Sequence, residues 1–437
     1  MKKILESIKC NWLFIILVII FIILNIITFI KLGYDYSINS DDLSYINSGI
    51  TFYETGKITM HGVVSAQIMP GLTFIIAFFC LIFGTGSVLL ITLKIFYILM
   101  SILTMIVLYK TARIFANKYI STFVCLFLLV PDYLWMNNLI LTETPFMLLL
   151  LLLIYHSLKF IKEHKNKDYV LIIIYYIICL FIRPTIALLP IILILCLLIK
   201  KYNLKDLIKK TIIAAIAVLV FLTPWIIRNY QVFDKFIPLT YGMGNPLLLG
   251  TYQGENYPKD EDLDYKINVD DKMSSDMKKY LDSKYPRDKF KVYYSLEYDK
   301  MKAEYRMHYW WQEDKISMLK TYLIDKPKIM LFSSFYWEEL FNIDIKVNLL
   351  FRAIDLVLFF ISSIIIILRR KYLVPFLFLI LLYGYHIALY SYSFAYERYA
   401  ITLFPIRFII IAMGISLVCD AIKKIKPKIN DVASQHK

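Results

Sequence analysis

The sequence lacks the short motifs by which many soluble enzymes are recognised. It has no HExxH metal motif, no Walker phosphate loop, no GxSxG nucleophile motif and no glycine-rich dinucleotide pattern. Its six cysteines lie in or beside apolar segments, and no CxxC occurs. Neither a disulfide framework nor a zinc site is predicted. The sequence supports no cofactor, although acidic loop residues could bind a divalent ion.

Repeats are also missing: neither a solenoid-length repeat nor the inverted repeat of many transporters is visible. What the chain has in abundance is apolar residues. Its 437 residues are 59% hydrophobic, and the mean hydropathy is +0.61. A soluble domain is nearer half apolar. The chain is therefore predicted to be an all-α, polytopic membrane protein.

Charge is distributed unevenly along the chain. Residues 229–347 hold 18 basic and 20 acidic residues, whereas the remainder carries an excess of 17 basic residues. This excess falls largely in short loops between apolar spans, so it indicates topology and not nucleic-acid binding. Anionic lipid head groups on the cytoplasmic leaflet are its expected partners.

The first apolar span, Trp12–Ile30, is long enough to cross a bilayer and too long for a cleaved signal peptide. Lys2, Lys3 and Lys9 precede it and place the N-terminus in the cytoplasm. Ten spans follow from hydropathy, with every later basic cluster on the cytoplasmic side and both termini inside. The other nine are about Ser87–Tyr109, Tyr119–Leu134, Thr144–Phe160, Tyr169–Ile182, Thr185–Ile199, Thr211–Ile227, Asn348–Leu368, Tyr372–Tyr390 and Tyr399–Cys419.

Three regions follow from this topology. Residues 1–228 form an N-terminal transmembrane module whose first outer loop is 31–86; residues 229–347 form a mostly helical outer cap, and residues 348–437 form the last spans and a basic tail. Pro70–Gly84 is apolar but short, and a full crossing there would invert the later charge pattern. We expect it to be a re-entrant or surface-lying helix. Helices are expected at Leu281–Tyr294 and Tyr298–Leu323.

Several ionisable residues are predicted at the outer mouths of spans, against the prevailing charge rule. Carboxylates there can take a proton from an acceptor hydroxyl, and arginines can hold a phosphate through paired hydrogen bonds. Interhelical ion pairing is the alternative for each, and Asp42 alternatively caps a helix. The residues are Asp41, Asp42, Glu143, Arg183, Arg228, Glu397 and Arg398.

Two further residues are candidates at the same face. Lys94, a third of the way into its span, could neutralise a lipid phosphate, or it could reach the surface by snorkelling. His61 lies in the first outer loop, where an isolated histidine is equally compatible with a structural role.

The order of short motifs resembles the polyprenyl-phosphate-dependent glycosyltransferases of the GT-C class, the bacterial protein-mannosyltransferase-like and aminoarabinose-transferase-like family. The similar pieces span about Trp12 to Cys419. They are Ser40-Asp41-Asp42-Leu43-Ser44-Tyr45, Gly56, Pro70-Gly71-Leu72, Phe83-Gly84, Lys94, Leu141-Thr142-Glu143-Thr144-Pro145-Phe146, Phe181-Ile182-Arg183-Pro184-Thr185, Thr223-Pro224-Trp225-Ile226-Ile227-Arg228-Asn229, Gly250, Glu397-Arg398-Tyr399 and Pro405.

The resemblance implies a GT-C-like bundle in a bacterial plasma membrane, with the active site on the outer face. It implies transfer of a hexose or pentose from a polyprenyl-phosphate donor to a lipid, glycan or protein acceptor, with inversion. Asp41 would be the general base, with Asp42 beside it. Arg183, Arg228, Lys94 and Arg398 would bind the donor phosphate. Glu143, His61, Glu397 and Tyr399 would position the acceptor.

Two other functions remain open from the sequence. A transporter or lipid flippase would explain intramembrane charge, but not an acidic pair in a short outer loop. An O-antigen polymerase or ligase also has many spans and a large outer loop, but it uses diphosphate-linked donors and lacks this early acidic motif. The glycosyltransferase is the prediction that accounts for both features.

Overall fold

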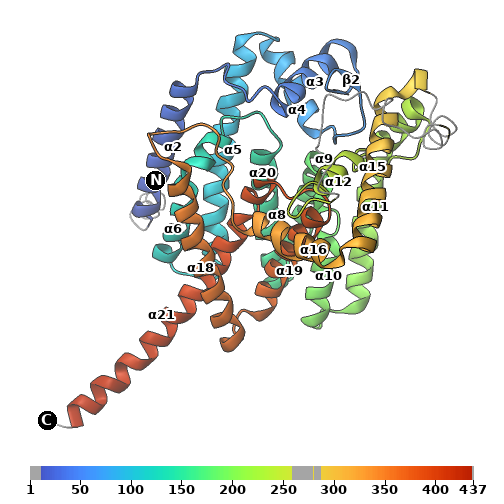
Figure 1. The fold of residues 1–437 in the computed structure, drawn as a ribbon. Helices are drawn as coiled ribbons and strands as arrows, with labels where there is room; N and C mark the ends of the chain where they lie inside the picture. Colours follow the sequence, from blue (N-terminus) through green and yellow to red (C-terminus); the bar gives the residue numbers. More distant parts are fainter. Residues whose placement is uncertain (1–10, 258–278, 280–286, 436–437) are drawn as a thin grey trace.

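The computed structural model describes residues 11–257, 279 and 287–435, and its regular structure is almost entirely helical. The predicted all-α, multi-pass membrane protein is confirmed (Figure 1). In the described part of the chain, seven segments are long and apolar enough to cross a membrane. They are α2 (Trp12–Leu32), α5 (Ser87–Ala112), α8 (Glu143–Glu163), α11 (Leu204–Phe233), α18 (Ile345–Arg369), α19 (Leu373–Tyr392) and the segment Glu397–Lys423, which comprises α20 (Glu397–Ile401) and the start of α21 (Phe404–Gln435).

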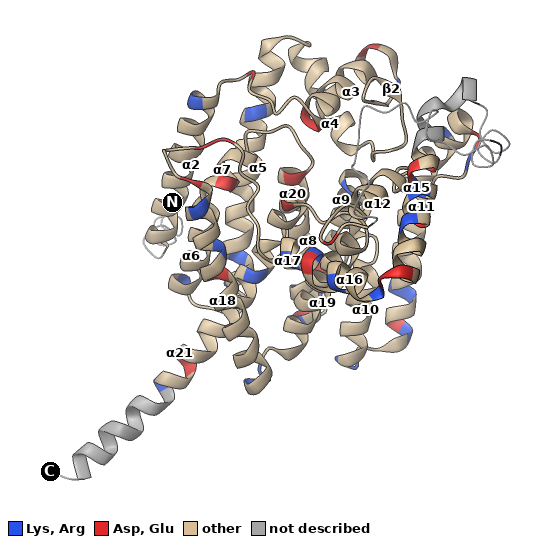
Figure 2. Cartoon of the chain, viewed as in Figure 1, with Lys and Arg blue, Asp and Glu red and all other residues tan. Residues whose placement is uncertain are grey.

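The spans differ in how deeply they lie in the bundle. Burial covers 72% of the apolar window of α8 and 89% of the window at α20–α21, but only 22% of that of α2 and 11% of that of α11. The first two therefore form the centre, and the last two present isoleucine, leucine and valine side chains to the surroundings. Long stretches of the bundle helices carry no charged residue (Figure 2), as a hydrocarbon environment requires.

Three of the ten predicted spans lie in helical segments of at most 17 residues, and a fourth is interrupted. The predicted Tyr119–Leu134 span is broken into α6 (Lys118–Cys125), the 3₁₀ turn η1 (Leu126–Leu129) and α7 (Pro131–Met136), because Pro131 cannot continue a helix. The last span is likewise interrupted between α20 and α21, just before Pro405. The predicted span Tyr169–Ile182 corresponds to α9 (Asn166–Ile182). The predicted span Thr185–Ile199 corresponds to η2 (Pro184–Ile186) followed by α10 (Leu189–Ile199).

One end of the bundle carries a compact cover made from the first loop (top of Figure 1). It contains α3 (Asp41–Thr55), a hairpin of β1 (Thr59–Met60) and β2 (Val63–Val64), and α4 (Gly71–Phe83). The 13 residues of α4 are about 20 Å long, less than the hydrocarbon thickness. The helix predicted at Pro70–Gly84 is confirmed, and its depth in the membrane stays a prediction.

We call the end that carries Asp41 and Glu143 the site end, and the end where α5 and α8 finish the basic end. At Gly71, on the site end, a Cβ atom would lie 2.5 Å from the carbonyl oxygen of Phe181. Only glycine allows this close approach, which brings α4 against the last turn of α9 and next to Arg183.

The region predicted as an outer cap contains α12 (Gly244–Gly250), α15 (Arg287–Glu313), α16 (Lys315–Lys320), the π-helical turn η3 (Thr321–Asp325) and α17 (Lys326–Leu331). Two helices are expected there, Leu281–Tyr294 and Tyr298–Leu323. The structure instead joins the end of the first to most of the second in α15, which runs without a break from Arg287 to Glu313. Residues 281–286 lie outside the described residues. The boundary between domains stays a prediction.

Candidate functional site

Four of the predicted site residues form one chain of ion pairs at the site end. Arg398 Nη2 donates to Asp41 Oδ2 at 2.7 Å, and Arg398 Nε lies 2.9 Å from Glu143 Oε1. Arg183 Nη2 donates to the same Glu143 oxygen, and its Nε donates to Thr142 Oγ1 at 2.7 Å. Glu143 therefore holds both arginines, and Arg398 connects it to Asp41.

Local structure positions each member of this chain. Asp41 is the first residue of α3 and Glu143 the first residue of α8. The positive end of a helix dipole stabilises a carboxylate at such a position. Arg183 ends α9 in an extended conformation because Pro184 follows it and disfavours helical geometry. Arg398 lies in the single short turn of α20.

Aromatic rings surround the two arginines. The Arg183 guanidinium lies 5.1 Å from the centre of the Tyr399 ring and 5.4 Å from that of Phe146. The Arg398 guanidinium lies 5.5 Å from the Tyr399 ring. Tyr399 is thus shared by both cations, which agrees with its predicted place in the site.

Tyr45, which the sequence analysis did not single out, is also part of this environment. It is one turn after Asp41 on α3 and is buried. Burial, with the nearby Asp41 charge, raises the pKa of Tyr45. Its phenol therefore stays protonated. The signal that could have identified it is the i, i+4 spacing from Asp41 on a helix.

Asp42 differs from Asp41 in its contacts. Its carboxylate accepts hydrogen bonds from Ser37 Oγ at 2.7 Å, from the Ile38 amide at 2.9 Å and from the Ser40 amide at 3.1 Å. The side chain is buried within its own loop. These bonds fix the turn that presents Asp41, and the predicted catalytic role of Asp42 stays a prediction.

His61 reaches Asp41 from the hairpin. With φ of 52° at His61 and 79° at Gly62, the two residues form the left-handed pair that a tight two-residue hairpin turn requires. His61 Nε2 lies 3.9 Å from Asp41 Oδ1, and its Nδ1 lies 2.9 Å from Ser44 Oγ. The structure thus brings this predicted residue to the edge of the site.

Arg228 supports the hairpin from the end of α11. It donates to the Ser65 carbonyl at 2.8 Å, to the Ile58 carbonyl at 3.3 Å and to Asn229 Oδ1 at 2.9 Å. Ile58 and Ser65 flank the two strands. Arg228 thus fixes the backbone on both sides of the hairpin, and its predicted role in binding a phosphate stays a prediction.

Lys94 and Glu397 lie outside the ion-pair chain. Lys94 is buried and donates to the carbonyls of Gly33 at 3.0 Å and Tyr36 at 2.9 Å, so it anchors the loop before Asp41. Glu397 begins α20 and is half-buried. Among the described residues, neither forms an ion pair with Asp41, Glu143, Arg183 or Arg398.

The turn that carries Arg398 is held from the cap. Gln253 donates to the Ala395 carbonyl at 2.6 Å and accepts from the Ala395 amide at 3.0 Å. Lys326, fully buried in α17, donates to the Ser393 carbonyl at 3.1 Å. A Cβ atom at Gly250 would lie 1.7 Å from that carbonyl oxygen. The cap therefore fixes the backbone just before α20.

A second charge cluster was missed by the sequence analysis. Arg352 Nη2 donates to both carboxylate oxygens of Asp132, at 2.9 and 2.8 Å, and Arg352 Nη1 donates to Asp355 at 3.4 Å. Arg407 Nη2 lies 2.6 Å from the other oxygen of Asp355. The signal was present as two opposite charges three residues apart, Arg352 and Asp355, within an apolar span. We call these four residues the sealed quartet.

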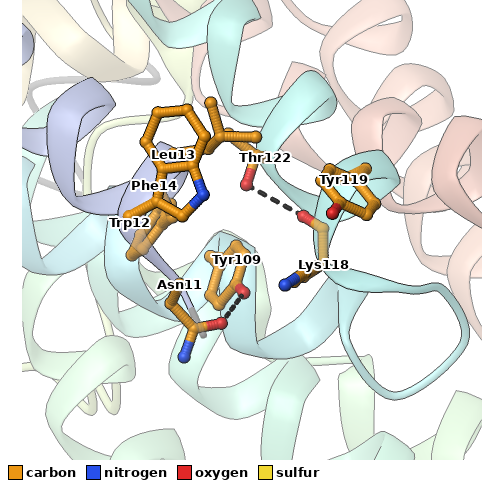
Figure 3. A pocket seen from close by; sticks show the side chains of 8 residues that line it. All are labelled: Asn11, Trp12, Leu13, Phe14, Tyr109, Lys118, Tyr119 and Thr122. Atoms are coloured by element: carbon orange, nitrogen blue, oxygen red, sulfur yellow. Dashed lines mark hydrogen bonds between the residues drawn. The ribbon is translucent and has the colours of Figure 1, made fainter. Parts of the chain in front are cut away.

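Two cavities lie at the basic end, away from Asp41 and Glu143. The smaller, about 10 Å³, lies between Tyr109 and the residues that begin α2 and α6 (Figure 3). There the Tyr109 hydroxyl donates to Asn11 Oδ1 at 2.8 Å, and the Tyr109 ring stacks on Phe14. Its volume suits one water molecule. The larger lies between the ends of α5 and α8. Among the described residues, no group of three or more His, Cys, Asp or Glu could hold a metal ion.

Residues 68–227 match the family model described as dolichyl-phosphate-mannose-protein mannosyltransferase. The matched segment contains Lys94, Glu143 and Arg183 and excludes Asp41 and Arg398. No curated protein sequence is similar enough to match the chain.

Two solved structures are similar to the chain. The archaeal oligosaccharyltransferase AglB from Archaeoglobus fulgidus, in complex with an inhibitory peptide and a dolichol-phosphate, is 12% identical with a TM-score of 0.53. The similarity covers 97% of this chain and 52% of AglB, so the chain spans about half the length of that protein. ArnT from Cupriavidus metallidurans bound to undecaprenyl phosphate is 13% identical with a TM-score of 0.42, over 92% of this chain and 77% of ArnT.

The AglB structure shows a similar fold, and the family match adds a sequence signal over residues 68–227, slightly more than a third of the chain. The match includes two members of the ion-pair chain and reaches almost to Arg228. Together these findings support the GT-C-type, polyprenyl-phosphate-dependent membrane glycosyltransferase that was predicted from the sequence.

Proposed function

We propose that the chain transfers a sugar from a polyprenyl-phosphate donor to an acceptor at the site end, with inversion at the anomeric carbon. One observation carries this proposal. In the ion-pair chain, the side chains of Glu143, Arg183 and Arg398 are at most 9% exposed, whereas that of Asp41 is 28% exposed. Asp41 is therefore the carboxylate that a substrate can reach, beside two held cations.

The chemistry follows from this arrangement. Asp41 takes the proton of an acceptor hydroxyl as its oxygen attacks the anomeric carbon. The bond from that carbon to the phosphate oxygen breaks, and its electron pair leaves with the polyprenyl phosphate. Arg183 and Arg398 stabilise the negative charge that develops there. Glu143 orients both guanidiniums and takes no proton in this scheme.

A second observation supports phosphate binding by Arg183. Among the described residues, its buried Nη1 has no hydrogen-bond partner. An unpaired buried donor is costly, and an anionic oxygen would satisfy it. Arg183 therefore ranks first among the four predicted phosphate ligands. Arg228 and Lys94, which both donate to backbone carbonyls of neighbouring loops, rank below the two arginines of the ion-pair chain.

The remaining parts of the proposal concern placement and substrates. The site end faces outward across a bacterial plasma membrane, and both termini are cytoplasmic, because the basic clusters gather at the other end. The donor sugar is a hexose or a pentose, and the acceptor is a lipid, a glycan or a protein. Neither nucleic acid nor a cofactor takes part.

The test is mass spectrometry of membrane lipids from cells that lack the protein, complemented with wild type, Asp41→Asn or Glu54→Gln. Glu54 is an exposed acid at the far end of α3 and is the matched control. A polyprenyl-phosphate sugar should accumulate in the null strain and be cleared by wild type and Glu54→Gln, but not by Asp41→Asn. An unchanged lipid pool, or clearance by Asp41→Asn, would overturn the proposal.

A further inference from the structure

A large basic pocket lies at the opposite end of the bundle from Asp41. Its volume is about 410 Å³, and its wall includes Lys110, Arg113, Tyr155, Lys159, Lys162 and Glu163. Glu143 begins α8 and Glu163 ends it, so a helix about 30 Å long separates the site from this pocket. The two therefore lie at opposite membrane faces.

The wall of the pocket carries cations in a regular arrangement. Lys110 and Arg113 are three residues apart at the end of α5, and Lys159 and Lys162 are three residues apart at the end of α8. Residues at this spacing lie on one side of a helix. The two helices pack against each other, so each contributes a pair of cations to one shared space.

Part of this positive charge is already compensated within the protein. Lys159 lies 3.6 Å from buried Asp168, which is also 2.7 Å from His156 Nδ1. Glu163, the acidic residue of the wall, pairs with Lys165 at 2.7 Å.

Within the described ranges, the other wall cations, Lys110, Arg113 and Lys162, have no carboxylate partner. Arg113 Nη1 donates to the Ala116 carbonyl at 2.7 Å. In the part of the chain that the structure describes, the side chains of Lys110 and Lys162 form no hydrogen bond or ion pair. The ammonium groups of Lys110 and Lys162 are therefore available to bind an anion, together with the Arg113 nitrogens other than Nη1.

The surface next to the pocket indicates what kind of anion fits. Leu99 and Leu103 are 53% and 49% exposed on α5, and with Lys110 they follow the i, i+4, i+11 spacing of one helix face. The face is apolar toward the middle of the membrane and cationic at its end. This is the pattern that an acyl chain and a phosphate head group require together, and a soluble anion would not use the apolar part.

We propose that the pocket formed by the ends of α5 and α8 binds the phosphate head group of an anionic membrane phospholipid, with its acyl chains along Leu99 and Leu103. This inference does not depend on the proposed glycosyl transfer. It assigns the lipid to the leaflet opposite the Asp41 site.

The test uses the delipidated full-length protein in detergent and native mass spectrometry during titration with phosphatidylglycerol or phosphatidylcholine. The variant is Lys110→Gln/Lys162→Gln. The control is Lys200→Gln/Lys201→Gln, two exposed lysines in the turn between α10 and α11. All four positions are exposed, so these substitutions should leave the fold intact.

Wild type and control should prefer phosphatidylglycerol, and the pocket variant should bind it on the order of tenfold more weakly. Equal affinity for both lipids, or an equal loss in the control, would show diffuse surface charge and overturn the proposal. A third arm adds inorganic phosphate at millimolar concentration. Complete displacement of the lipid would identify a soluble-anion site and would also overturn it.

Discussion

The ion-pair chain at the site end and the sealed quartet are built from the same kinds of group, two carboxylates and two guanidiniums each. In the quartet all four side chains are fully buried. Both carboxylate oxygens of Asp132 accept hydrogen bonds from Arg352 Nη2. In the site, by contrast, the Asp41 side chain at the end of the ion-pair chain is 28% exposed. Among the described residues, buried guanidinium nitrogens without a hydrogen-bond partner occur in both clusters, at Arg183 Nη1 and at Arg352 Nε.

This difference separates a structural cluster from one that can act on a substrate. Arg407 donates to the Leu331 carbonyl at 2.7 Å and Ser334 donates to Asp132 at 3.0 Å. The quartet therefore connects α7, α18 and α21 to the last residue of α17 and to the segment after it. Removing one charge from such a cluster leaves its partner buried and unpaired. We expect the quartet to control stability and the site to control rate.

The largest expected effect is on rate, at the exposed end of the site. Asp41→Asn removes the proton acceptor, so transfer should fall by about 10² to 10⁴-fold. The free energy of unfolding should fall less than in a quartet variant, since Asp41 is 28% exposed and Arg398 keeps Glu143 as a partner. The measurement is turnover of the donor lipid that accumulates in null cells, with thermal unfolding in parallel. Near-normal turnover would remove Asp41 from the role of base.

The next effect is on stability, in the quartet. Arg352→Met leaves Asp132 and Asp355 without their shared partner and should destabilise the protein by about 3–5 kcal/mol. Thermal unfolding in detergent measures this, with Arg369→Met at the exposed end of the same helix as control. If both variants unfold at the same temperature as wild type, the quartet does not stabilise the bundle.

A smaller effect distinguishes donor from acceptor within the site. Arg183→Ala removes a charge-assisted hydrogen-bond donor and should raise the KM for the donor lipid by about 10- to 100-fold, with less change for the acceptor. Arg183→Lys keeps the charge but loses the forked geometry, and should give an intermediate KM. Equal changes in both KM values would argue against phosphate binding.

The smallest effect concerns Lys326, a buried cation that belongs to neither cluster. Burial lowers the pKa of Lys326 to about 7 from its usual value near 10.5. The unfolded chain binds this proton between pH 7 and 10.5 and the folded chain does not, so wild-type stability should rise with pH across that window. Lys326→Met should lose this slope. The measurement is the unfolding temperature of wild type and of Lys326→Met at pH 7, 8 and 9. If the unfolding temperature changes with pH equally in both proteins, the pKa of Lys326 is not lowered in the folded state.

Much of this arrangement could be predicted from the sequence, for identifiable reasons. Asp41, Glu143, Arg183 and Arg398 stand at the ends of apolar runs, where hydropathy alone places them near one membrane face. The resemblance then groups them into one site, and the structure shows them in contact. The match to a known family covers only two of these four residues, Glu143 and Arg183.

Other features could not be read from hydropathy. The roles of Lys94 and Arg228 depend on which carbonyls lie within 3 Å, and this requires the folded loops. The break at Pro131 divides a run whose composition alone resembles one span. The sealed quartet joins Asp132 to residues 220 positions and more away in the chain, a pairing that local patterns do not contain.

The hairpin turn at His61 and Gly62 has one more consequence, for the engineering of this protein. A tight turn with positive φ at both positions is formed best by Asn-Gly, so His61→Asn should raise the melting temperature. The same substitution removes the imidazole beside Asp41. Screens that select variants for thermal tolerance alone would therefore favour a chain with a poorer catalytic environment, a local trade-off between robustness and activity.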